Sequence, residues 1–303
     1  MDCCNTPGNF INTDSWDEID YITELELNSK LWLDHSFLQI GAWTNVETGD
    51  DQCSKDWYTL KRVNNSQADT SNYYIWGVEK QDIVWESVTG DVTNTLPVTI
   101  YHNSVDVTND FSINYVKGIF ITPTKYTGVL EASYSFRNVT TYVHQAAPWW
   151  SELLANRYDL DSDVIWGVFK KHSVSLPCII IKGKSKVGFK PIQIGSRGQY
   201  VDRDISFTIF AANSITANKI LNILSSQKDN NITLLDSSLA EFPLDCNGEI
   251  INNNTYSDLV TDNPWRCAEI VKVYNSEVES PITNLFINQV TMTFRVRNPV
   301  KNR

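Results

Sequence analysis

The feature that most constrains the fold is a series of short strand-like segments between residues 57 and 145. Aromatic and β-branched residues fill each segment, and turn-forming residues such as Asn103-Ser104 and Thr127-Gly128 separate them. The segments cover residues 73–78, 82–86, 97–101, 111–115, 118–121 and 130–136. Short strands at regular spacing with such breaks predict a small antiparallel β domain.

Helical periodicity appears on both sides of this series. Residues 20–40 carry leucine and isoleucine at a helix-like though imperfect spacing, which predicts a helix. Residues 215–226 place apolar residues at i, i+3, i+4 and i+7, and Ser214 stands where an N-cap is expected. A third helical stretch is expected to open at Trp149, directly after the boundary segment 146–148.

The second half of the chain adds strands of its own. Residues 176–181, 205–211, 232–235 and 290–296 each read as a strand, and the last of them alternates most clearly, with Thr291, Thr293 and Arg295 on its polar face. We therefore predict an α+β fold, in which an antiparallel β-rich domain precedes an α+β domain whose sheet is covered by one or two helices. The predicted units are an N-terminal helix and acidic arm (1–56), the β domain (57–147) and the α+β domain (148–303).

Composition narrows the classes of function. The chain has 303 residues, is 42% hydrophobic and carries a formal net charge of −11. An acidic surface repels phosphate backbones and anionic lipid, which disfavours a dedicated DNA-binding or membrane-surface protein. There is no apolar run long enough for a transmembrane helix and no secretion signal at the start, and the six cysteines are too scattered for a disulfide framework. We expect a soluble protein made in the cytosol with reduced cysteines and no membrane partner.

The charge is polarised along the chain. Residues 1–29 hold seven acids and no lysine or arginine, whereas residues 295–303 hold Arg295, Arg297, Lys301 and Arg303 and no acid. Such ends are either solvated or act as arms that pair with neighbouring copies in an assembly.

Searches for catalytic and metal-binding patterns find no strong candidate. Gly183-Lys184-Ser185 follows a strand as in a phosphate loop, but Cys178 stands where that loop needs glycine, so we expect a basic hairpin turn there. The acids of residues 159–163 begin like a calcium loop, but Val164 and Lys170 occupy its glycine and glutamate positions. The four histidines share no known motif. We expect a protein that is not an enzyme and that holds no cofactor and no metal.

Ten tryptophans leave a carbohydrate-binding module or a glycan-active protein as an alternative. Exposed aromatic rings stack on sugar faces, and Trp76 and Trp85 are the candidates, although core packing is the more common use of a tryptophan within a strand.

Two stretches resemble proteins of tailed bacteriophages. The first comprises VTIYHNSVDV at 98–107, FSINYVKGIF at 111–120 and LEASYSF at 130–136, and it resembles the β domain of phage neck, adaptor and tail structural proteins. The second runs from LPCIII at 176–181 through DISFTIFA at 204–211 to the helix at 215–226, and it resembles a tail terminator, an α+β protein that forms a hexameric ring on the tail tube.

The resemblance implies a virion structural protein of the neck or tail, assembled in the host cytoplasm. It would form a homo-oligomeric ring of six or twelve copies that caps the tail tube, joins it to the head connector and contacts other neck and tail proteins. DNA would pass through the ring without specific binding; a baseplate or tail-tube position is the alternative within this class. The candidate interface residues are Trp149, Trp150, Arg295, Arg297, Asp17, Glu18 and Asp20.

Overall fold

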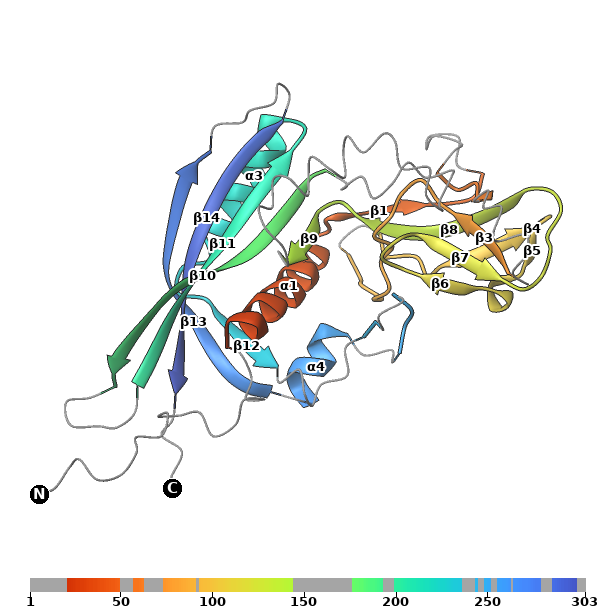
Figure 1. Cartoon of the computed structure of the whole chain (residues 1–303). Helices are drawn as coiled ribbons and strands as arrows, with labels where there is room; N and C mark the ends of the chain where they lie inside the picture. Colours follow the sequence, from red (N-terminus) through yellow and green to blue (C-terminus); the bar gives the residue numbers. More distant parts are fainter. Residues whose placement is uncertain are drawn as a thin grey trace, which may run out of the picture.

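The computed structural model (Figure 1) describes residues 21–49, 57–62, 73–90, 93–143, 176–192, 199–235, 243–244, 248–251, 255–262, 264–278 and 285–298. The described residues form a mixed α+β fold with two bodies, a β sandwich and a six-stranded sheet that carries helices. The predicted α+β class is therefore confirmed.

The sandwich consists of two four-stranded antiparallel sheets. In the first, the strand order is β1 (Trp43–Val46), β8 (Leu130–Arg137), β4 (Thr99–His102) and β5 (Val105–Asp106). In the second, it is β2 (Lys61–Arg62), β3 (Tyr74–Gly77), β7 (Ile119–Thr122) and β6 (Ser112–Asn114), and a 3₁₀ turn, η1 (Thr108–Asp110), precedes β6. Both sheets contribute to one core, which includes the fully buried Tyr134 and Phe120.

The turn predicted at Asn103-Ser104 joins β4 to β5. Both residues have positive φ angles, 51° and 64°, as a two-residue type I′ hairpin turn requires. Asparagine tolerates this backbone region better than most residues, so the local sequence fits the tight hairpin.

The larger sheet has the order β12 (Asn231–Leu235), β13 (Pro264–Glu277), β14 (Phe286–Asn298), β11 (Gln199–Ala211), β10 (Cys178–Pro191) and β9 (Thr140–Val143). All neighbours are antiparallel except β9 and β10. The four central strands are long, and they pair along most of their length as β10–β11, β11–β14 and β14–β13.

Helices α1 (Tyr21–Gln39) and α3 (Ser214–Ser225) cover one face of this sheet, and the short helix α4 (Tyr256–Asp262) lies beside β12 and α1. Leu33 of α1, Ile220 of α3 and Phe207 of β11 belong to the same buried cluster. Alternating apolar residues on β11 and β14 face these helices, as the sequence predicted for Ile205, Phe207 and Ile209.

Two short connections between the two bodies lie within the described residues. Helix α1 packs on the six-stranded sheet, and β1, which begins four residues later, pairs with β8 in the sandwich. After β8, only Asn138 and Val139 intervene before β9 pairs with β10 in the larger sheet. The division into 1–56, 57–147 and 148–303 stays a prediction, because the proposed boundary at 146–148 lies outside the described residues.

Three local predictions are wrong in detail. Residues 82–86 form only an isolated bridge between Ile83 and Phe136, and Asp82 at the start of this segment has a φ of 57°. Residues 182–185 are not a hairpin turn but lie within β10, where the pairing with β11 is irregular between Gly183 and Val187. The N-cap of α3 is Asn213, whose side chain accepts from the backbone N–H of Thr216, and Ser214 is the first helical residue.

Candidate functional site

The six-stranded sheet has two unlike faces. The helix-covered face holds the main core, and no described helix shares a core with the side chains that point to the other side. We call this other side the open face. Its side chains are those of Cys178, Ile180, Lys182, Lys184, Lys190, Tyr200, Asp202, Asp204, Ser206, Thr208, Phe210, Glu269, Lys272, Tyr274, Ser276, Ile287, Gln289, Thr291, Thr293, Arg295 and Arg297.

Arg295, one of the predicted interface residues, is held in an ion pair at the charged end of the open face. Its Nε and Nη2 donate to the two oxygens of Asp202 at 2.8 and 3.0 Å. Lys190 Nζ lies 2.9 Å from the same carboxylate, and the Tyr200 ring centroid lies 5.5 Å from the guanidinium carbon. The hydrogen bond from Arg295 is the largest cause that lowers the pKa of Asp202, and the same bond raises the pKa of Arg295. The two hydrogen bonds make a bidentate pair that holds the guanidinium group and the carboxylate in fixed positions.

Arg297 lies two residues further along the same face and is exposed. The two arginines are therefore neighbours on one surface; Arg297 is exposed, and Arg295 is partly exposed and paired with Asp202. The other predicted interface residues, Asp17, Glu18, Asp20, Trp149 and Trp150, lie outside the described residues.

The centre of the open face is polar and closely hydrogen-bonded. Gln289 Nε2 donates to Ser206 Oγ at 2.6 Å, and Lys184 Nζ donates to Thr291 Oγ1 at 3.1 Å. Thr293 Oγ1 donates to Asp204 Oδ1 at 2.6 Å. Ser206 and Thr291 are only 4% and 6% exposed, although none of the described helices packs on them. The longer side chains of Gln289 and Lys184 provide hydrogen-bond partners for these two hydroxyl groups.

The opposite end of the open face is apolar. Cys178, Ile180, Phe210 and Ile287 form a small buried cluster there together with Leu285. Burial is the main cause that raises the pKa of the Cys178 thiol, so it stays protonated at neutral pH and behaves as a small hydrophobic residue. The open face thus changes from apolar at one end to charged at the other.

Both sides of the sheet end in strands that are only partly paired within the described residues. β9 pairs with β10 only over Cys178–Ile181, which leaves the outer side of β10 without a strand partner from Lys182 to Pro191. On the other side, β12 pairs with β13 up to Glu269, and Ile270 bonds to the turn at Asn230. The outer side of β13 from 271 to 277 has no described strand beside it. An unpaired strand edge is a template for pairing with another chain.

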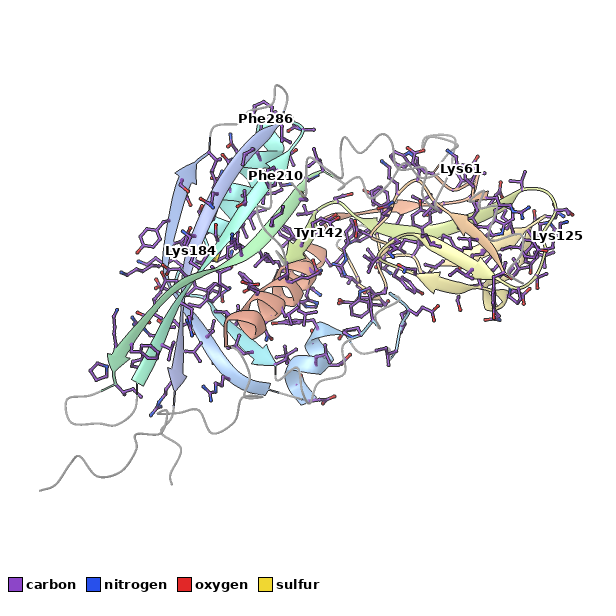
Figure 2. All side chains as sticks on the ribbon, in the orientation of Figure 1. Lys61, Lys125, Tyr142, Lys184, Phe210 and Phe286 are labelled. Carbon is purple, nitrogen blue, oxygen red and sulfur yellow. The ribbon has the colours of Figure 1, made fainter. Side chains whose placement is uncertain are left out.

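The free part of the β10 edge touches α1 at one point. The backbone N–H of Gly183 donates to Glu26 Oε1 of α1 at 2.5 Å. The start of α1 therefore lies at the side of β10, next to Lys182 and Lys184, which are both exposed on the open face. Figure 2 labels Lys184 on this sheet and Lys125 at the far end of the sandwich.

A network of charged groups connects the two bodies. The Glu86 side chain is 3% exposed and lies between His35 Nδ1, 3.2 Å away, and Arg137 Nη2, 3.9 Å away. Arg137 also donates from Nη1 to the backbone oxygen of Asp34 at 2.8 Å, and Thr141 Oγ1 donates to the Asp34 carboxylate. Because Arg137 ends β8 and both His35 and Asp34 belong to α1, these bonds tie the sandwich to the helix-covered sheet.

Asp82 lies at the same junction. Burial is the largest influence on it and raises its pKa to about 6, while a hydrogen bond from Thr140 and the charges of Lys30 and Arg137 act in the opposite direction. Thr140 Oγ1 donates to Asp82 Oδ2 at 3.1 Å. The junction therefore contains a carboxyl group that changes its charge close to neutral pH.

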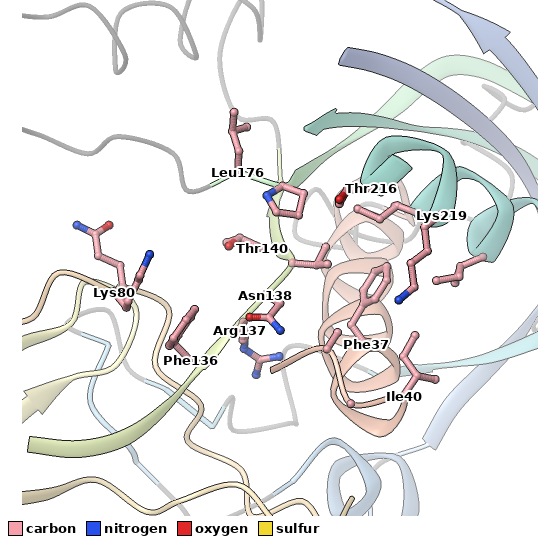
Figure 3. A pocket seen from close by; sticks show the side chains of 17 residues that line it. Phe37, Ile40, Lys80, Phe136, Arg137, Asn138, Thr140, Leu176, Thr216 and Lys219 are labelled. Carbon is pink, nitrogen blue, oxygen red and sulfur yellow. The ribbon is translucent and has the colours of Figure 1, made fainter. Parts of the chain in front are cut away.

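Figure 3 shows a cavity of about 440 Å³ at this junction, between the end of α1, the end of β8 and one side of α3. Apolar side chains such as Phe37, Phe136 and Ile220 line it, together with Lys80 and Lys219. Lys80 Nζ lies 4.2 Å from the Trp57 ring centroid, a cation–π contact that holds this charge at the rim. No carboxylate is among the residues that line this cavity.

The two tryptophans proposed for sugar binding differ in environment. Trp76 is 7% exposed and belongs to the sandwich core, so its ring is not available to a sugar. Trp85 is half-buried and lines a smaller cavity of about 240 Å³ with Tyr256, Glu86 and Arg137. Of the two candidate tryptophans, Trp85 alone is accessible to a sugar, and the carbohydrate-binding alternative stays a prediction.

Metal and membrane sites were also sought in the part of the chain that the structure describes. It contains no group of three or more His, Cys, Asp or Glu side chains arranged to hold a metal ion. None of its helices combines the length and apolar character that a membrane span needs.

The sequence did not predict β13, which provides one of the two free edges. Its alternation is interrupted because the pairing with β14 shifts between Ile270 and Lys272, so no continuous apolar face appears in residues 264–277. On each side of this shift, two residues point to the same face of the strand: Ala268 and Ile270 before it, and Lys272 and Tyr274 after it. These two short alternations are the sequence pattern from which β13 could have been predicted.

The sequence matches no family model and no curated protein.

Proposed function

We propose that this protein is a structural subunit of the neck or tail of a tailed bacteriophage, where copies of it form a ring. The ring, of six or twelve copies, caps the tail tube, joins it to the head connector and leaves a channel through which DNA passes without specific binding. In this proposal the protein acts by assembly and not by catalysis, contacts other neck and tail proteins, and is incorporated into the virion in the host cytoplasm.

The observation that supports assembly is the pair of strand edges, on opposite sides of the six-stranded sheet, that lack a strand partner over part of their length among the described residues. Three antiparallel steps separate β10 from β13, so the two edge strands run in opposite directions. If a second copy stands beside the first in the same orientation, its β10 edge therefore meets the β13 edge of the first as an antiparallel partner.

The two free parts are displaced along the strands. Through the shared register, residues 272–277 of β13 align with Asn288–Thr293 of β14, whereas Lys182–Pro191 of β10 align with the part of β14 from Thr291 to Asn298. Pairing thus requires a stagger between neighbouring copies. A contact between two different surfaces of the same molecule is heterologous, and repeated contacts of this kind close into a ring when the rotation between copies allows it.

Native mass spectrometry and cryo-electron microscopy of the purified full chain test this proposal. We expect a closed ring of six or twelve copies and, in its map, strand density continuous between neighbouring copies. A protein that stays monomeric at high concentration and does not add to purified tails would overturn the proposal.

A matched pair of variants tests the edge itself. Tyr274 on the free part of β13 and Tyr73 in the sandwich are 50% and 54% exposed. A lysine on an edge strand opposes pairing with another strand, so we expect Tyr274→Lys to reduce the ring population at least tenfold and Tyr73→Lys to leave it unchanged. Equal ring formation by both variants would exclude the β13 edge as the contact.

A further inference from the structure

We propose that the open face of the six-stranded sheet is a docking surface for the acidic N-terminal segment, residues 1–20, of the same chain. The inference goes beyond the proposed function and does not depend on ring formation. It rests on the charge of the open face, on the charge of the segment and on the point from which the segment leaves the fold.

The open face has the opposite sign of charge from the whole molecule. The chain carries a net charge of −11, yet the described side chains of the open face include six cations and three carboxylates. The cations are Lys182, Lys184, Lys190, Lys272, Arg295 and Arg297, and the carboxylates are Asp202, Asp204 and Glu269. Asp202 is already neutralised by Arg295 and Lys190, so the free charge that remains is predominantly positive.

The N-terminal segment is complementary to this face. Residues 1–20 contain Asp2, Asp14, Asp17, Glu18 and Asp20 and no lysine or arginine. Four of the five acids fall within the seven residues that precede α1, so the highest density of negative charge lies close to the start of the helix. Opposite charges at close range attract with an energy that salt reduces.

The start of α1 is placed so that the segment reaches the open face. The hydrogen bond from Gly183 to Glu26 brings the first turns of α1 to the free side of β10, where Lys182 and Lys184 stand on the open face. A chain of 20 residues spans up to about 65 Å when extended, and a six-stranded sheet is about 25 Å wide, so the segment is long enough to pass around the β10 edge and cross the face.

Zero-length cross-linking of carboxylates to lysines in the intact full chain tests the contact. At low ionic strength we expect cross-links from the acids of residues 14–20 to Lys182, Lys184 and Lys272, and none to the exposed Lys117 and Lys125 of the sandwich. About 1 M salt should abolish them, because the Debye length is then about 3 Å. Cross-links spread evenly over all exposed lysines would overturn the proposal.

An isotope mixture shows whether the segment docks on its own chain. Equal amounts of unlabelled and ¹⁵N-labelled protein are mixed before cross-linking, and the cross-linked peptides are weighed. We expect both halves of each cross-link to carry the same label. Mixed labels in half of the cross-linked peptides would place the segment on a neighbouring copy and would contradict docking within the chain.

A neutralised variant provides an independent readout. We expect the fourfold variant Asp14→Asn, Asp17→Asn, Glu18→Gln and Asp20→Asn to raise the rate of acetylation of Lys184 at least threefold and to leave the rate at Lys125 unchanged (Figure 2). Unchanged Lys184 reactivity in this variant would overturn the proposal, as would protection of Lys184 that arises only when duplex DNA is added.

Discussion

The sandwich and the six-stranded sheet differ in what buries the apolar faces of their β-sheets. In the sandwich, each four-stranded sheet covers the inner face of the other, and large side chains such as Tyr134 and Phe120 are fully buried between them. In the six-stranded sheet, α1 and α3 cover one face, and no described helix packs on the other. A body whose sheets cover each other is complete by itself, whereas a half-covered sheet with free edges is suited to further contacts.

The difference also shows in the polar groups. The open face keeps its hydroxyl groups and charges hydrogen-bonded to each other, as in the Lys184–Thr291 and Thr293–Asp204 pairs. At the junction of the two bodies, by contrast, charged groups are buried, and Glu86 depends on His35 and Arg137 for its partners. We therefore expect substitutions at the junction to cost more stability than substitutions on the open face.

The largest effect is expected from Arg137→Met. This change leaves the buried Glu86 without its arginine and removes the bond to the Asp34 backbone, so we expect the free energy of unfolding to fall by about 3 kcal/mol. Urea unfolding followed by circular dichroism measures it. Lys117→Met, which removes an exposed charge from the sandwich, is the control and should change stability by less than about 0.5 kcal/mol. An equal effect of both changes would mean that the Glu86–Arg137 contact does not hold the bodies together.

A smaller and pH-dependent effect is expected from Asp82→Asn. An aspartate titrates near 3.8 when unfolded and Asp82 titrates near 6 when folded, so the folded protein loses stability as the pH rises from about 4 to 6 and does not regain it above 6. The asparagine variant lacks this loss and tolerates the positive φ angle. We expect it to equal the wild type at pH 4 and to be more stable by about 2 kcal/mol at pH 7.5.

Thermal unfolding of both proteins across this pH range measures the difference. Asp106 serves as the control, because hydrogen bonds from Thr108 lower its pKa and its contribution to stability is lost only as the pH falls below about 4, so the stability difference for Asp106→Asn should stay nearly constant from pH 4 to 7.5. A difference for Asp82→Asn that does not vary between pH 4 and 7.5 would show that Asp82 is already ionised at pH 4.

The smallest effect is expected from Arg295→Met on the open face. The Arg295–Asp202 pair is bidentate but partly exposed, and Lys190 still neutralises Asp202 after the change, so we expect a loss of about 1 kcal/mol at neutral pH. Because the pair lowers the pKa of Asp202, the difference from the wild type should shrink as the pH falls below 4. Chemical denaturation at pH 7 and pH 3 tests this, and a loss as large as that of Arg137→Met would remove the distinction between the open face and the junction.

The sequence predicted much of the fold because its patterns are local. The alternation at Ile205, Phe207 and Ile209 and the helical spacing in α3 depend only on the order of residues in the sequence. Each pattern indicates that one face of its strand or helix is buried in the core. The same patterns failed where a neighbouring strand or a backbone angle decided the outcome, as at Asp82 with its positive φ and in β13 with its shifted pairing.

The candidate surfaces were predicted only in part. Arg295 was correctly assigned to the polar side of the last strand, because alternation fixes the side of a strand on which a residue lies. The strand continues beyond the predicted end at residue 296, which places Arg297 on the same side. That Arg295 is held by Asp202, 93 residues away, depends on the pairing of β11 with β14, which no local pattern encodes.

By itself, the sequence determined the class of fold, the position of most strands and helices, and the separation of an acidic start from a basic end. Only the tertiary structure decided that α1 and α3 cover the same face of the larger sheet and that parts of β10 and β13 have no strand partner among the described residues. It also decided that cations predominate among the described charges of the open face of an acidic molecule. Hydrophobic periodicity and secondary-structure propensity are properties of residues close together in the sequence. The covered face of a sheet, its unpaired edges and the electrostatic field at its surface arise from pairings between segments far apart in the chain.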